Sequence, residues 1–142
     1  MFRALCVGLL IAAPALAESK DEYVMRKTLE SLQGNWGVTN MAVAGMPAAP
    51  GSLRGMGYRF DEDRMIQTQQ PEEAARLLID VSGSVPKVEF TDRHGINMVG
   101  IMQRVGDKVY MCLVEAGNAP PTTFTSSTDN KAVLIELSRP RP

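Results

Sequence analysis

The clearest pattern in the sequence is an alternation of side chains over residues 94–115, interrupted by a turn at Gly106-Asp107. A period of two is that of a pleated strand, so this stretch predicts a two-stranded hairpin. The second strand is mostly apolar on both faces, with Val109, Met111 and Leu113 on one and Tyr110, Cys112 and Val114 on the other. Such a strand needs a core on one side and at least partial cover on the other.

Residues 21–33 have the spacing of an amphipathic helix instead. Asp21 or Ser19 is a suitable N-cap, and Gly34 follows the last turn as a stop signal. We expect this helix to cover a barrel mouth or an outer sheet face, since its apolar stripe is far too weak for a membrane helix. That stripe consists of Val24, Met25, Thr28, Leu29 and Leu32.

After the helix the pattern is extended to the end of the chain. Short strands joined mostly by short turns are typical of an antiparallel sandwich or a closed barrel. Closure removes the unpaired strand edges that invite aggregation. About eight strands are predicted, at residues 36–43, 57–60, 65–69, 76–81, 87–91, 96–104, 108–115 and 132–139.

One connection is much longer than a hairpin turn. Residues 116–130 contain Gly117, Pro120 and Pro121, followed by a run of hydroxyl residues around Phe124. A loop of this length in a compact domain indicates either a flap with its own contacts or a missed strand. We expect Phe124 to anchor the loop in the core rather than to recognise a partner.

The first seventeen residues have the features of a signal peptide. Arg3 precedes an apolar run over residues 4–13, and Ala15-Leu16-Ala17 matches an A-x-A cleavage site. The run is too short to span a bilayer, so we expect no membrane span in the mature chain. These features predict export to the periplasm or the exterior, cleavage after Ala17, and a single domain over residues 18–142.

Composition restricts the chemistry further. The 142 residues carry a formal net charge of −1 without a basic block, which argues against nucleic acid as a partner. Of the two cysteines, Cys6 leaves with the signal, so the mature chain has no internal disulfide and Cys112 is expected to be a small buried residue. The fold must therefore depend on burial and hydrogen bonding.

No arrangement of residues indicates catalysis, a metal or another cofactor. The single histidine, His94, stands in a turn without a second ligand at metal-binding spacing. Asp61-Glu62-Asp63 lacks the spacing of a calcium loop and is better explained as a solvated hairpin turn. We therefore expect a protein that is not an enzyme, with a reactive Cys112 as the less favoured alternative.

Several sequence blocks resemble one family. Residues 32–36 (LQGNW) are similar to its L-Q-G-x-W, residues 86–90 (PKVEF) to its P-K-x-[ILV]-[DE]-[FL], and residues 106–112 (GDKVYMC) to its G-D-x-[LV]-x-[LM]-C. Residues 115–126 (EAGNAPPTTFTS) resemble its E-x-G-x-x-x-P-T-x-F-x-S. The family comprises small, exported, uncharacterised lipocalin-like domains of planctomycete-type bacteria. The chain departs from it at Pro120, where a basic residue is expected, and at Met102, where an aromatic one is common.

The resemblance implies an all-β fold: an antiparallel up-and-down lipocalin-like (calycin-type) barrel of about eight strands, preceded by one short helix. By analogy with lipocalins, Trp36 is expected to close one end of the barrel as a structural plug. The resemblance implies little about activity, because one fold serves many functions.

Two functions agree with these expectations. The first is a non-enzymatic binding module for a small apolar or amphipathic molecule, since methionine-rich interiors line adaptable pockets. Its pocket candidates are Met65, Ile79, Phe90, Met98, Met111 and Ile135. The second is an envelope protein–protein interaction domain with a filled core, contacting its partner through residues 116–128 or the apolar stretch 41–56.

Overall fold

The computed structural model describes residues 18–140, so the predicted signal peptide lies outside the described residues. Helix α1 (Lys20–Leu32) is followed by a long first strand, β1 (Gly34–Val43). Of the two expected caps, Ser19 is the one used, because its hydroxyl accepts a hydrogen bond from the Glu22 amide at 3.1 Å. The helix ends before Gly34, whose φ of 99° suits a glycine.

The strands that follow lie close to their predicted positions. They are β3 (Gly57–Asp61), β4 (Arg64–Gln67), β5 (Ala74–Asp80), β6 (Lys87–Asp92), β7 (Asn97–Val105), β8 (Lys108–Glu115) and β9 (Val133–Ser138). The sequence pattern missed β2 (Met46–Pro47), which pairs only with the end of β1. Two residues between turns carry no detectable alternation, so this strand had no signal.

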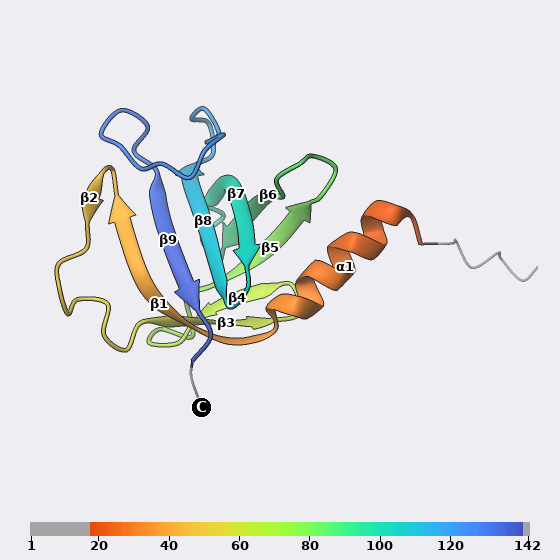
Figure 1. The fold of residues 1–142 in the computed structure, drawn as a ribbon, viewed down its shortest axis with the longest axis horizontal. Coiled ribbons are helices and arrows are strands. Elements are labelled where there is room, and N and C mark those ends of the chain that lie inside the picture. Colours follow the sequence, from red (N-terminus) through yellow and green to blue (C-terminus); the bar gives the residue numbers. More distant parts are fainter. Residues whose placement is uncertain (1–17, 141–142) are drawn as a thin grey trace, which may run out of the picture.

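The sheet is antiparallel throughout and closes on itself. From β3 to β9 each strand pairs with the next along the chain, and β1 pairs with β3 at its start and with β9 along its second half. Eight strands therefore form the wall of an up-and-down barrel, and the predicted lipocalin-like barrel with one preceding helix is confirmed (Figure 1). A bulge between Val38 and Asn40 shifts the register where β1 follows β9.

The barrel interior contains the main hydrophobic core. Its buried residues come from all eight wall strands, and Leu32 adds the end of α1. Met25 and Leu29 of the helix pack against the same cluster, so α1 covers one end of the interior, as its apolar stripe predicted. In Figure 1 the helix lies beside the lower end of the barrel, and the loop between β8 and β9 lies at the upper end.

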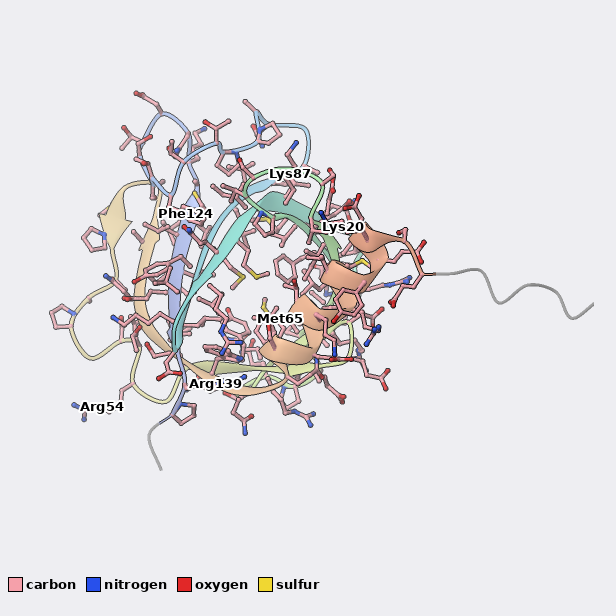
Figure 2. All side chains as sticks on the ribbon, turned by 45° about the vertical axis from the view of Figure 1, so that its right-hand side comes forward. Lys20, Arg54, Met65, Lys87, Phe124 and Arg139 are labelled. Carbon is pink, nitrogen blue, oxygen red and sulfur yellow. The ribbon has the colours of Figure 1, made fainter. Side chains whose placement is uncertain are left out.

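The long β8–β9 loop forms a second layer outside the barrel. Phe124 packs with a smaller cluster on the outer face that includes Ile101, Cys112 and Val114. Strand β8 is thus buried on both sides, by the interior on one and by the loop on the other. The strand thus has the expected cover on its second face. Phe124 anchors the loop on this outer cluster and not in the barrel interior, where a core plug was expected. Figure 2 shows Phe124 near the upper end.

Candidate functional site

The six pocket candidates lie together in the barrel interior. Five of them are buried members of the main core, and Met98 is partly buried against it; Figure 2 labels Met65 among them. Alternation along each strand therefore placed all six side chains on the inward face. Their role as ligand contacts stays a prediction.

Trp36 lies at the start of β1, next to the end of α1, and is only 1% exposed. Its indole Nε1 donates a hydrogen bond to the Leu32 carbonyl at 2.7 Å. The guanidinium carbon of Arg139 lies 3.9 Å from the ring centroid, and that of Arg104 lies 5.6 Å from it. The polar indole atom is therefore paired, and a cation lies over the ring. That Trp36 closes the barrel as a structural plug stays a prediction.

Arg139, which follows β9, also links the C-terminal end of the barrel to the end of α1. Its guanidinium donates hydrogen bonds to the carbonyls of Gln33 at 2.8 Å and Ser31 at 2.9 Å. Burial lowers the pKa of Arg139, and the nearby charge of Arg104 lowers it further. Figure 2 places Arg139 at the lower end of the barrel, below α1.

Three hollows on the surface of residues 18–140 differ in size and in lining. Two are small, at about 210 Å³ beside β1 and β9 and about 280 Å³ between α1 and β7. The largest has a volume of about 550 Å³. Ile79 lines this one, whereas the other five candidates line none of the three. The candidates therefore do not surround the largest of the three hollows.

The largest hollow, called the outer groove below, lies across the outside of β5, β6 and β7. Its floor is mostly apolar and includes Leu78, which is 51% exposed, together with Val99 and the buried Ile101. The remaining lining residues are Ile79, Asp80, Lys87, Val88, Glu89, Gly100, Pro120, Pro121 and Thr122. The last three belong to the β8–β9 loop, which therefore supplies one wall.

The loop keeps this position because its second half is attached to the outside of the barrel. Phe124 packs on the outer cluster, and the Ser126 hydroxyl donates to the Ala132 carbonyl at 2.6 Å and accepts from the Gly45 amide at 2.8 Å. The Asn130 side chain also donates to the Thr125 carbonyl at 2.7 Å. Beyond these anchors, the two prolines are conformationally stiff and have no N–H to donate.

Cys112 lies beneath the same loop. Its Sγ donates to the Thr125 carbonyl at 3.5 Å, and the residue is buried, as predicted. Burial raises the pKa of the Cys112 thiol, and the contact with Thr125 opposes this only in part. A thiol held protonated under cover is a poor nucleophile.

Strand register arranges the charges of the outer groove. Lys87 on β6 lies opposite Asp80 on β5, whereas Glu89 lies between Leu78 on β5 and Val99 on β7. Hydrogen bonds from the Ser82 hydroxyl and amide hold the pKa of Asp80 below its usual value, and the charge of Lys87 lowers it further. One carboxylate, that of Glu89, is thus flanked by apolar side chains.

The other polar residues considered from the sequence lie elsewhere. His94 is in an exposed turn, where its Nε2 accepts a hydrogen bond from Arg93 Nε at 3.2 Å. In the β3–β4 turn, the Asp63 carboxylate forms an ion pair with Arg76, with 3.2 Å between Oδ2 and Nε. Within residues 18–140, no three His, Cys, Asp or Glu side chains meet as metal ligands would. The described part of the chain also contains no helix long and apolar enough to cross a membrane.

Sequence reasoning missed the outer groove because it searched only the inward phase of each strand. A signal was present in the outward phase, where Leu78 and Val99 are apolar on strands that both pair with β6. Comparisons with protein-family models, curated proteins and solved structures found no match.

Proposed function

We propose that this protein is an exported, non-enzymatic binding module whose small apolar or amphipathic ligand lies in the outer groove. The observation that carries the proposal is a hollow of about 550 Å³ with a mostly apolar floor and a few charged side chains. Ligand sites usually have volumes of about 300–1,000 Å³ and this kind of lining. We further propose that the chain belongs to the exported lipocalin-like family that it resembles.

The groove is favoured over the interior as the ligand site for a physical reason. Leu78 exposes half of its surface on the floor, so a ligand would remove apolar area from water without displacing protein atoms. Five of the six inward candidates are buried members of one hydrophobic cluster and the sixth packs against it, so a ligand among them would have to open a packed core.

Binding of the neutral dye N-phenyl-1-naphthylamine, followed by fluorescence, tests this function. We expect saturable binding at one site, and we expect Leu78→Asn to weaken it by roughly tenfold because an apolar contact is replaced by an amide. Ile96→Asn is the matched control, since Ile96 is an isomer of leucine, is 49% exposed and lies outside the groove. Absence of saturable binding would refute the proposal.

A second variant separates the groove from the interior. Met98→Ala alters a partly buried inward side chain that does not line the groove. If Met98→Ala weakens dye binding and Leu78→Asn does not, the ligand lies in the interior and the groove assignment is wrong. Export has its own test, because N-terminal sequencing of the protein from the cell envelope should begin at Glu18.

One observation favours a second function, an envelope protein–protein interaction domain. Met46 on β2 is 73% exposed and stands beside Val43, which is 49% exposed. Adjacent exposed apolar side chains on the edge strand β2 and at the end of β1 suit a partner surface. An envelope pulldown that returns the same partners with wild type and with a deletion of residues 45–51 would exclude this surface.

A further inference from the structure

We propose that Glu89 makes the outer groove selective for amphipathic molecules that carry a single positive charge, such as an alkylammonium. The inference rests on the proposed function and adds the chemical class of the ligand. It depends on charge complementarity between one carboxylate and the head group of a molecule whose apolar part covers the floor.

Glu89 occupies the middle strand of the groove floor. It is half-buried on β6, with Leu78 on one side and Val99 on the other as cross-strand neighbours. None of the ion pairs found within residues 18–140 includes its carboxylate. A carboxylate between apolar side chains has lost some water without gaining a cation, so a cationic ligand would restore a favourable contact.

The other two charges of the groove have opposite signs and lie near each other, although no ion pair joins them within residues 18–140. Lys87 lies opposite Asp80 in the β5–β6 register, close enough for its charge to act on the Asp80 carboxyl group. With one lysine and two acids, the three ionisable lining residues sum to −1 at neutral pH. An anionic head group directed at Lys87 would therefore have to compete with Asp80 and would be repelled by Glu89.

The position of Glu89 also separates the two parts of such a ligand. A cation above the carboxylate would leave its alkyl chain free to lie along Val99 and Ile101 toward Pro120 and Pro121. The proline rings offer apolar surface, and their stiffness limits the entropy lost when the wall is covered. The ligand class is therefore an alkyl or aryl body with one amine or quaternary ammonium.

Three probes with the same alkyl chain and different head groups test the inference. These are dodecyltrimethylammonium, dodecyl sulfate and dodecyl maltoside, each kept below its micelle-forming concentration and titrated against bound N-phenyl-1-naphthylamine. We expect the cation to displace the dye at the lowest concentration. Its advantage over the maltoside should shrink as salt is added, because a half-exposed charge pair is screened.

Glu89→Gln should weaken dodecyltrimethylammonium by about threefold to fivefold, the effect of one partly exposed ion pair, and leave the maltoside unchanged. Glu72→Gln is the matched control, because Glu72 is exposed and lies outside the groove while the net charge changes equally. Circular dichroism of each variant checks that the fold is retained.

The outcomes separate the two proposals. If dye and maltoside bind but the cation has no advantage, or keeps its full advantage in Glu89→Gln, the role of Glu89 is refuted and the binding module stands. If none of the probes and no dye binds, the proposed function itself is refuted. A loss of equal size in Glu72→Gln would assign the effect to net charge and would also overturn the role of Glu89.

Discussion

Replacing Arg139 by alanine removes a side chain that joins the end of the last strand to the end of the helix and to Trp36. Three hydrogen bonds are lost, two short ones to the carbonyls of Gln33 and Ser31 and a long one of 3.5 Å to that of Asn35. The contact over the Trp36 ring is lost as well. A hydrogen bond from a charged group contributes about 1.5–3 kcal/mol, and a cation over an aromatic ring contributes about 0.5–1 kcal/mol at an exposed site.

The loss of stability should be smaller than the sum of these contributions. The Ser31 carbonyl keeps a partner in the variant, because Arg104 still donates a 2.6 Å hydrogen bond to it. The Gln33 carbonyl then loses its partner, and the indole loses its cover. We therefore expect Arg139→Ala to lower the free energy of unfolding by about 3 kcal/mol. With a urea dependence of roughly 2 kcal/mol per molar, the unfolding midpoint falls by about 1.5 M.

Far-ultraviolet circular dichroism in urea is the suitable assay, since Trp36 is the single tryptophan and its fluorescence would respond to the substitution itself. Arg76→Ala is the control, because this arginine makes one exposed ion pair with Asp63 and its removal should cost less than about 1 kcal/mol. Arg139→Lys, which keeps the charge without the planar fork, should fall between the two. Equal losses in Arg139→Ala and Arg76→Ala would refute the reasoning.

Two further stability predictions follow from the wall and its cover. Gly100→Ala should lower the free energy of unfolding by at least about 2 kcal/mol, because a Cβ there would overlap the Cys112 carbonyl oxygen. Gly83→Ala is the control and should be nearly neutral in the same urea titration, because a Cβ at Gly83 would have its nearest neighbour 3.7 Å away. Burial raises the pKa of the Cys112 thiol above its ordinary 9.0. As pH rises, the thiol therefore ionises in the unfolded chain before it does so in the folded protein. The stability that is fully present below pH 9 is lost as pH rises through the folded-state pKa. Cys112→Ala should therefore lose less stability than wild type between about pH 8 and pH 10, and an identical loss would contradict a protonated buried thiol.

The barrel was predictable because each of its strands carries a local signal. On β8, Val109, Met111 and Leu113 alternate with their neighbours, and turn residues mark both ends, so neither pairing nor burial had to be known in advance. Closure between β1 and β9 required more than alternation, because these strands are separated by most of the chain. It was inferred from the number of strands and from the resemblance.

The outer groove was harder to predict for a related reason. Leu78 and Val99 are outward residues on different strands, and only the register through Glu89 makes them neighbours. The wall at Pro120 depends on where Phe124 is anchored, which is a tertiary contact with no sequence period. A site formed by register and loop anchoring cannot be read from the periodicity of any one strand.

Pairing between β1 and β9 also has a consequence for how the protein folds. The first and last strands of the wall share six pairs of residues, from Gly37 opposite Ser138 to Val43 opposite Val133. Until β1 and β9 pair, the sheet is open and has two unpaired edge strands. Contacts between segments so far apart in the sequence form slowly. A variant that weakens the β1–β9 pairing is therefore expected to expose these two strand edges and to associate with its own copies.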